Sequence, residues 1–154
     1  MVYEKDKLSF EELNLSNIKI LVELQNKTNF KKWNLSEVRH LLMKGSGQGF
    51  IMFNFLGPVG FCLYRYLIDE AEILSIGVLN NYRRKGFGIK MMIELERIFV
   101  NKNISKCFLE VSKSNKPALE FYSKIGFSFV KTLNNYYKRE NDFENGLLLQ
   151  KLYN

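Results

Sequence analysis

The segment that most limits what this chain can fold into is residues 73–99. Here a strand-like run, Ile73–Val78, leads through a basic turn into Gly86–Phe99, which carries apolar residues at helical spacing. The turn itself, Arg83–Gly88, holds three cations and two glycines. Glycines let backbone N–H groups approach an anion, and a helix N-terminus adds partial positive charge. The segment therefore predicts a strand–turn–helix unit that can cradle a pyrophosphate.

Two better-known phosphate loops are excluded by the residues around this turn. A nucleotide P-loop would end in Gly-Lys-Ser or Gly-Lys-Thr, which the turn does not. A dinucleotide-binding fingerprint would need a third glycine where Met91 stands. A basic helix start with two turn glycines and no ligand remains the alternative interpretation.

The rest of the chain alternates between strand-like and helix-like patterns in the order β-α-α-β-β-β-α-β-α-β-β. The expected strands are 8–13, 50–55, 59–66, 72–78, 106–111, 127–133 and 146–152, and the expected helices are 16–26, one starting at Asn34 or Ser36, 86–99 and 117–125. An antiparallel meander that feeds into a strand–helix–strand unit predicts an α/β sandwich with a mixed sheet. At 154 residues, we expect one domain spanning 1–154.

Composition narrows the class of protein further. No apolar run approaches the roughly 20 residues that span a bilayer, and the N-terminus has no signal-peptide pattern. Cys62 and Cys107 lie in separate apolar runs, so we expect buried free thiols in a reducing cytoplasm. His40 is the one histidine, which leaves little for a Ser-His or Cys-His nucleophile or for a metal site, and we expect no metal.

The formal net charge of +7 suggests a polyanionic partner such as nucleic acid, an anionic membrane or a phosphate-rich cofactor. The alternative is compositional, because abundant Lys and Asn also arise from a base bias in the coding DNA. The placement of the charge is therefore more informative than its sum.

Several stretches resemble one family. Arg83–Gly88 matches the (Gln/Arg)-x-x-Gly-x-(Gly/Ala) signature of the GCN5-related N-acetyltransferases (GNAT), which bind acetyl-coenzyme A. Other stretches are similar to its RimI branch, the ribosomal-protein N-terminal acetyltransferases: Asp69–Leu74, Glu110–Ser112 with Asn115, Phe121–Phe127, Asn135–Tyr137, and Phe30 with Trp33 and Ser36. The resemblance covers most of the chain and implies a GNAT-type α+β fold, with a mixed, mostly antiparallel central sheet flanked by helices.

The resemblance also implies roles for individual residues. Glu110 would be the general base, acting through a water, and Tyr122 the acid that protonates the coenzyme A thiolate. The acceptor would bind between Trp33 and the pair Tyr136 and Tyr137. The residues implied to bind the coenzyme are Ile76, Gly77, Val78, Arg83, Arg84, Lys85, Gly86, Phe87, Gly88, Ile89 and Asn115.

The residues taken alone also allow plainer interpretations. Glu110 would be a surface carboxylate that ends a strand, and Tyr122 a helix aromatic packed on the sheet. Asn115 is a candidate helix cap. Tyr136 and Tyr137 follow two asparagines at an expected connection between strands, where we do not expect both to belong to the core, so they are candidates for binding.

The leading hypothesis is an enzyme that uses acetyl-coenzyme A to acetylate the α-amino group of a protein, with a ribosomal protein as the family's usual target. Acetylation of a lysine or a small amine is the alternative within this class. A non-catalytic module that binds coenzyme A, or nucleic acid through Arg83, Arg84 and Lys85, is the alternative outside it. We expect a monomer or weak dimer with no membrane partner. No stable nucleic-acid binding is expected, because the three cations cluster at one loop.

Overall fold

The computed structural model describes residues 7–28 and 33–153. Phe30, part of the resemblance near the start of the chain, lies outside these ranges. The strands are β1 (Ser9–Glu12), β2 (Gln48–Asn54), β3 (Gly57–Leu67), β4 (Glu70–Val78), β5 (Lys106–Ser112), β6 (Ser128–Lys138) and β7 (Phe143–Leu152). The helices are α1 (Ile18–Thr28), α2 (Leu35–Met43), α3 (Phe87–Asn101) and α4 (Lys116–Lys124), with a short 3₁₀ turn, η2 (Asn80–Tyr82), between β4 and α3. The expected order of strands and helices is confirmed.

Two helices begin where the sequence predicts a cap. Asn34 caps α2 rather than Ser36: its side chain accepts a hydrogen bond from Glu37 N at 2.9 Å, and the Glu37 carboxylate accepts one from Asn34 N at 2.7 Å. Asn115 caps α4 by accepting from Ala118 N at 3.3 Å. Local hydrogen bonding therefore fixes where each helix starts.

The strands form one seven-stranded sheet in the order β1-β2-β3-β4-β5-β7-β6. The pair β4–β5 is parallel and the other neighbouring pairs are antiparallel. This is the mixed, mostly antiparallel sheet that the sequence predicts.

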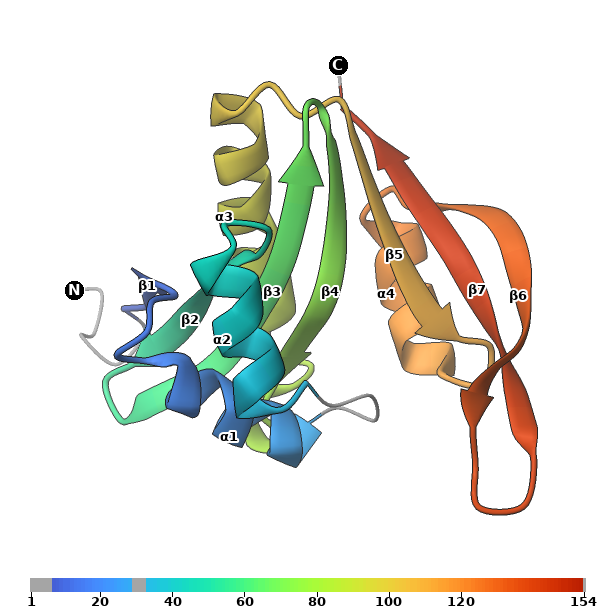
Figure 1. Cartoon of the computed structure of the whole chain (residues 1–154), viewed down its shortest axis with the longest axis horizontal. Helices are drawn as coiled ribbons and strands as arrows, with labels where there is room; N and C mark the ends of the chain where they lie inside the picture. Colours follow the sequence, from blue (N-terminus) through green and yellow to red (C-terminus); the bar gives the residue numbers. More distant parts are fainter. Residues whose placement is uncertain (1–6, 29–32, 154) are drawn as a thin grey trace.

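The sheet splits between its two central strands. β4 pairs with β5 only over Glu70–Ile73, opposite Lys106–Leu109. Beyond that point β4 stays paired with β3 as far as Val78, while β5 stays paired with β7 as far as Ser112. The two strands diverge like the arms of a V (Figure 1), so the parallel pair that joins the halves of the sheet is also the place where it opens.

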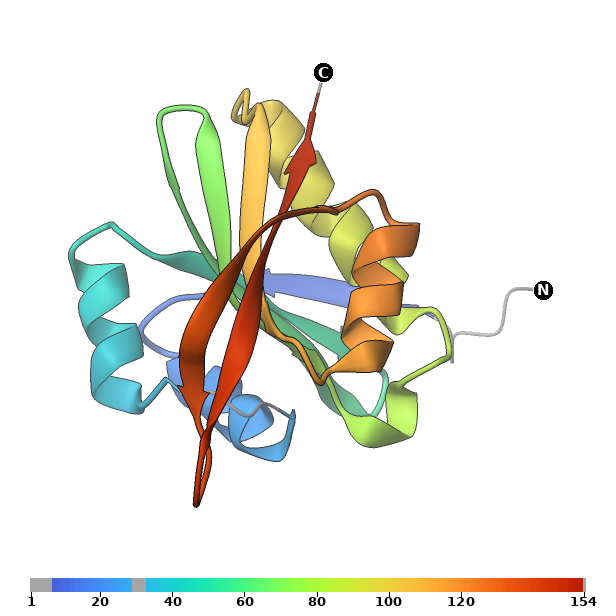
Figure 2. The same cartoon turned by 90° about the vertical axis from the view of Figure 1, so that its right-hand side faces the viewer.

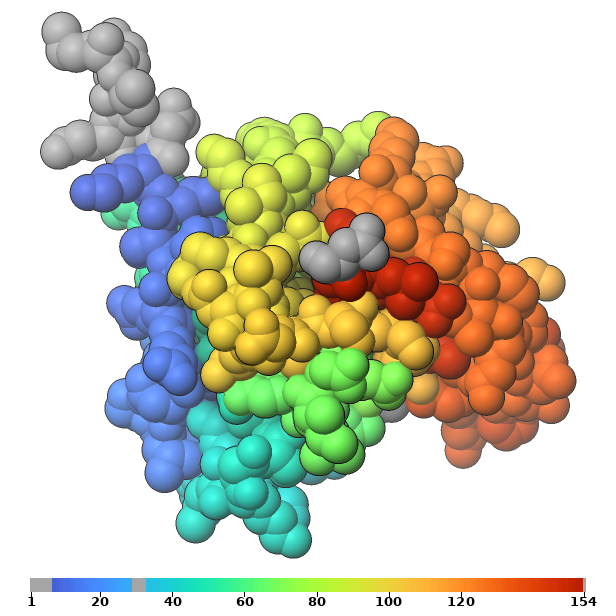
Figure 3. All heavy atoms as spheres, turned by 90° about the horizontal axis from the view of Figure 1, so that it is seen from above, coloured from blue at the N-terminus to red at the C-terminus, as the bar shows by residue number. Residues whose placement is uncertain are grey.

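Two helices cover each face of the sheet. Phe61 and Leu63 of β3 pack in a cluster with α1 and α2, which we call the α1 face. The alternating residues Cys62 and Tyr64 pack with α3 and α4 on the α3 face. Figure 2 shows α1 and α2 on one side of the sheet and α3 and α4 on the other. Seen from above, the last third of the chain forms its own side of the molecule (Figure 3).

Both cysteines are buried in the α3-face cluster with free thiols, as predicted. Burial raises the pKa of the Cys107 thiol to about 12, so it stays protonated at neutral pH. In the part of the chain that the structure describes, no helix is long and apolar enough to cross a bilayer.

The boundary that differs most from the prediction is the end of the sixth strand, expected at residue 133 and found at Lys138. Tyr136 and Tyr137 were expected in a connection between strands, but they lie inside β6, which continues to Lys138. The pairing with β7 jumps from Leu133↔Gly146 to Tyr137↔Glu144, so three residues of β6 bulge out opposite one. Asn135 in this bulge has φ +50°, a left-handed conformation in which asparagine is common. The same asparagine preference makes the bulge look like a turn in the sequence.

Candidate active site

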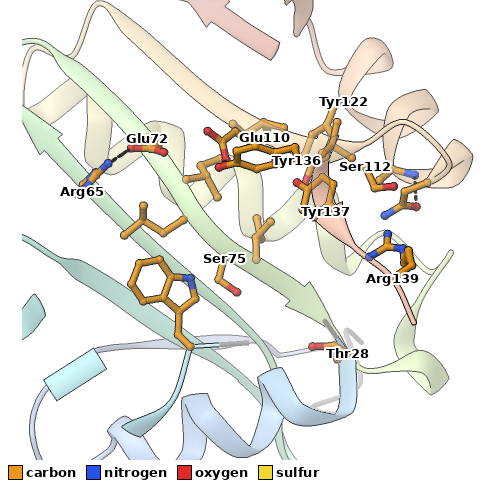
Figure 4. A pocket seen from close by; sticks show the side chains of 18 residues that line it. Thr28, Arg65, Glu72, Ser75, Glu110, Ser112, Tyr122, Tyr136, Tyr137 and Arg139 are labelled. Carbon is orange, nitrogen blue, oxygen red and sulfur yellow. Dashed lines mark hydrogen bonds and ion pairs between the residues drawn. The ribbon is translucent and has the colours of Figure 1, made fainter. Parts of the chain in front are cut away.

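A cavity of about 450 Å³ opens where β4 and β5 part (Figure 4). Its walls come from α1, β3, β4, β5, α4 and β6, so chain segments far apart in the sequence share it. The predicted site residues that line it are Trp33, Ile76, Glu110, Asn115, Tyr122, Tyr136 and Tyr137. The split sheet thus brings together the proposed base, the proposed acid and the proposed acceptor residues.

The cavity reaches both faces of the sheet. Leu109 and Val111 belong to the α3-face cluster, so Glu110 between them points to the α1 face. Tyr122 enters from α4 on the α3 face and is buried. Burial, with smaller contributions from the neighbouring thiols, raises the pKa of Tyr122 well above its ordinary value. Its hydroxyl therefore keeps its proton at neutral pH.

Glu110 is bound by a residue that was predicted for another role. The Tyr136 hydroxyl donates a hydrogen bond to Glu110 Oε2. Burial, together with this bond, raises the pKa of Tyr136 well above its ordinary value. Burial also raises the pKa of Tyr137 to about 12. Both phenols are neutral donors beside the carboxylate at physiological pH.

The bulge in β6 explains how the two tyrosines reach this wall. Asn145 Oδ1 accepts a hydrogen bond from Asn135 N at 2.9 Å, which secures the bulge to β7. A side chain at Gly146 would place its Cβ 3.0 Å from the Tyr137 ring and 3.1 Å from the Tyr136 ring. The absence of a side chain at Gly146 therefore lets the tyrosine pair pack against β7.

A polar cluster that the sequence did not reveal joins the end of the hairpin formed by β6 and β7 to the segment that leads into α4. Glu144 accepts hydrogen bonds from Ser112 Oγ at 2.5 Å and Ser114 N at 2.9 Å, and pairs with Arg139 at 2.5 Å. The two serine donors are the main cause that lowers the pKa of Glu144 to about 2. Because its members come from separate strands and a loop, no local spacing points to the cluster.

Two further charged residues on the cavity wall were also missed. Arg65 of β3 pairs with Glu72 of β4 at 2.6 Å, on the α1 face. Alternation along β3 and β4 would place them on one face, but only the register of the two strands makes them neighbours.

Trp33 is held by a buried side chain. Gln25 of α1 is fully buried, and its amide donates to the Trp33 carbonyl at 2.6 Å. The Ser75 hydroxyl of β4 donates to the other end of this amide at 3.0 Å. A bonded chain thus joins β4 to Trp33 through α1.

The basic turn lies beyond the far end of β4. Gly86 has φ +82°, a conformation that suits glycine, and α3 starts directly after it without a side-chain cap or an acidic residue in its first turn. Its first N–H groups are therefore available to an anion. The Arg83 guanidinium, however, donates to the carbonyls of Val78 at 3.0 Å and Thr28 at 3.3 Å. The first of the three cations thus already has two backbone partners.

Within residues 7–28 and 33–153, no three His, Cys, Asp or Glu side chains gather into a metal-binding group. The cavity wall offers two carboxylates, those of Glu72 and Glu110, together with three tyrosine phenols and the strand backbone beside the split.

Comparison with known proteins shows which family the chain matches. The model of the acetyltransferase (GNAT) family matches residues 18–127. An N-alpha-acetyltransferase of Sulfurisphaera tokodaii is 36% identical over 77 residues, which cover 49% of this chain and 46% of that protein. A ribosomal protein bS18-alanine N-acetyltransferase of Haemophilus influenzae is 30% identical over 95 residues, 62% of this chain and 64% of that one. The matches thus span about half to two thirds of these curated relatives.

A solved structure shows the same fold over nearly the whole chain. The crystal structure of the ribosomal-protein-S18-alanine N-acetyltransferase from Escherichia coli superposes with a TM-score of 0.84. The match covers 95% of this chain and 94% of that one, at 20% sequence identity. The likeness at this identity concerns the architecture.

Proposed function

The chain belongs to the acetyltransferase (GNAT) family, and from this premise we propose that it transfers an acetyl group from acetyl-coenzyme A to the α-amino group of a protein. One observation carries the proposal: a single cavity passes through the split sheet, with Glu110 on its α1 face and Tyr122 on its α3 face. Both substrates would meet there in one ternary complex, within a single domain formed by residues 1–154.

The α3 face suits the thioester substrate. The gap-side backbone of Ile76, Gly77 and Val78 faces no neighbouring strand in the described part of the sheet, so its amides can bond an extended, amide-containing chain. The start of α3, with Gly86, Phe87, Gly88 and Ile89, would take the pyrophosphate, assisted by Arg84 and Lys85. Asn115 lies on the wall between these places, although its side chain already caps α4.

The α1 face suits the amine. A peptide α-amino group has a pKa of about 7.7–8.0, so it loses its proton far more readily than a lysine at about 10.4. Tyr136 engages Glu110 Oε2, which leaves Oε1 to receive the proton directly or through a water. Trp33 and Tyr137 would hold the acceptor peptide on either side of this carboxylate.

The leaving group needs a proton donor, which Tyr122 can provide. Its raised pKa keeps the phenol protonated at neutral pH. As the amine nitrogen bonds to the acetyl carbon and the carbon–sulfur bond breaks, the phenol can donate its proton to the departing thiolate.

Two findings favour an α-amine over the alternatives. One reported relative is named an N-alpha-acetyltransferase and the other an alanine N-acetyltransferase of ribosomal protein bS18, and a carboxylate such as that of Glu110 is a modest base, which suits an α-amine better than a lysine. By the same reasoning, a ribosomal protein is the first acceptor to examine.

Mass spectrometry on two matched peptides tests the proposal. The first has a free α-amine and a dimethylated lysine, and the second has a blocked N-terminus and a free lysine. We expect acetyl transfer from acetyl-coenzyme A to the first peptide only. Transfer to the second alone would make the protein a lysine acetyltransferase, and transfer to neither, with coenzyme A still bound, would make it a binding module.

A further inference from the structure

Thr28 and Trp33 flank residues 29–32, and both line the α1 face of the cavity. Each has its backbone carbonyl bonded to a side chain from elsewhere: Thr28 to Arg83 at 3.3 Å, and Trp33 to Gln25 at 2.6 Å. Both side chains are in turn tied to β4, Arg83 through the Val78 carbonyl at 3.0 Å and Gln25 through the Ser75 hydroxyl at 3.0 Å.

The two points of attachment lie in the part of β4 that has left β5. Strand pairing with β5 ends at Ile73, and Ser75 and Val78 come after it. The Leu79 amide bonds to Val59 of β3, so the carbonyl of the same peptide unit, that of Val78, points to the gap instead. Thr28 and Trp33 are thus positioned from the edge of the opening itself.

The buried position of Gln25 is unfavourable for a polar side chain. It is 0% exposed, and a buried amide is costly unless both of its ends are hydrogen-bonded. A carbonyl can only accept, so Gln25 must present its NH₂ group to Trp33 and its oxygen to Ser75. An apolar residue would fill the same space, but it would hold neither partner in place.

Hydrogen bonding of its own side chain does not explain the position of Trp33. Its indole N–H is buried and has no hydrogen-bond partner among the residues that the structure describes. The Gln25 bond to its main chain therefore holds the ring at the cavity wall despite an unpaired donor.

We propose that Gln25 and Arg83 are positioning residues for the acceptor, which fix Trp33 and Thr28 against the free part of β4. The acceptor part of this inference rests on the proposed function. Arg83 then differs from its neighbours: it serves the amine side of the cavity, whereas Arg84 and Lys85 serve the coenzyme.

Steady-state kinetics of Gln25→Met provide the first test. Methionine keeps the length of the side chain and removes both hydrogen bonds. The KM for a peptide acceptor should rise about tenfold, the scale of a lost buried hydrogen bond, while the KM for acetyl-coenzyme A stays within about twofold. Leu24→Met is the matched control, because Leu24 is a buried neighbour on the same helix whose apolar side chain makes no hydrogen bond to either partner. Equal rises in both KM values, no rise at all, or the same pattern in the control would overturn the proposal.

Arg83→Met provides the second test, and it avoids the core because Arg83 is exposed. It should raise the KM for the peptide about threefold, whereas Arg84→Met should raise the KM for acetyl-coenzyme A. If Arg83→Met behaves like Arg84→Met, the first cation belongs to the coenzyme side and the proposal is wrong.

Fluorescence separates a failure of this inference from a failure of the proposed function. Trp33 is the one tryptophan of the chain, so its emission reports directly on the attachment. Gln25→Met should shift the emission to the red and increase quenching by acrylamide, and Leu24→Met should do neither. These readouts need no acceptor. An unchanged emission in Gln25→Met would refute the attachment even in an active enzyme, and the expected shift would support it even in a protein that acetylates no peptide.

Discussion

The two faces of the cavity are built in different ways. On the α3 face, the proposed coenzyme site comes largely from one continuous segment, Ile76–Ile89, which runs off β4 into α3. On the α1 face, the proposed acceptor site joins side chains from α1, β3, β4, β5 and the β6–β7 hairpin. The first relies on backbone geometry, and the second on side chains that only the complete fold brings together.

Because of this difference, the two faces should tolerate different substitutions. Backbone donors at a helix start depend on a few permissive residues, such as Gly86 with φ +82°, and are insensitive to most side chains nearby. The α1 face depends instead on specific bonds, such as Tyr136 to Glu110 and Gln25 to Trp33. Substitutions should therefore separate the faces by which substrate they affect.

Removing the proposed base should have the largest effect. Glu110→Gln keeps the shape and loses proton acceptance, so kcat should fall by about 10²–10⁴-fold while acetyl-coenzyme A still binds. Raising the pH should partly restore the rate, because solution then deprotonates the α-amine. Single-turnover rates from pH 7 to 9 measure this, with Glu120→Gln on the exposed side of α4 as the control. A full rate in Glu110→Gln would show that another group accepts the proton.

Distorting the backbone of the coenzyme side should come next. Valine at Gly86 must adopt φ +82°, which strains a β-branched residue, so Gly86→Val should raise the KM for acetyl-coenzyme A at least about tenfold. The KM for the peptide should change little. Gly45→Val is a matched control, because Gly45 has φ +66° in equally open space away from the cavity. Similar KM values in both variants would place the pyrophosphate elsewhere.

An acceptor-side aromatic should show the opposite selectivity. Tyr137→Ala should raise the KM for the peptide up to about tenfold and leave that for acetyl-coenzyme A nearly unchanged, since we assign its ring on the cavity wall to the acceptor. Phe129→Ala, an exposed aromatic on the same strand, should change neither. If Tyr137→Ala raises both KM values equally, this residue supports the fold.

The smallest effect should come from pH. The pKa of Glu144 lies at about 2, below its ordinary value, so its bonds stabilise the protein above pH 4.5 and lose that contribution as the pH falls towards 2. The Tm difference between the wild type and Glu144→Gln should therefore be largest near neutral pH and shrink in acid. Thermal melts from pH 6 to 2.5 test this. A difference that stays constant over this range would mean that the carboxylate does not anchor the hairpin.

Sequence patterns predicted the parts of the molecule that local forces determine. The order of strands and helices and the caps at Asn34 and Asn115 follow from short-range periodicity and hydrogen bonding. The family resemblance supplied residues that the fold does gather at one cavity, among them Glu110 and Tyr122.

What could not be predicted depends on register and on long-range contacts. The β6 bulge resembles a turn in sequence because both use asparagine at positive φ. The pair Arg139 and Glu144, and the bond from Gln25 to Ser75 fifty positions away, have no local signature. The residues next to Arg83 in the sequence predict that it binds a phosphate. Only the fold shows that its guanidinium bonds to two backbone carbonyls.

The split between β4 and β5 has a consequence for how such a protein can diverge. An intact sheet would separate its two faces, whereas an opening reached from both faces would give each proposed substrate its own route of approach. Changes around Trp33, Arg65 or Tyr137 can then alter which amine is accepted without disturbing the turn at Gly86. A lineage could exchange acceptors repeatedly and keep a single way of binding the acetyl carrier.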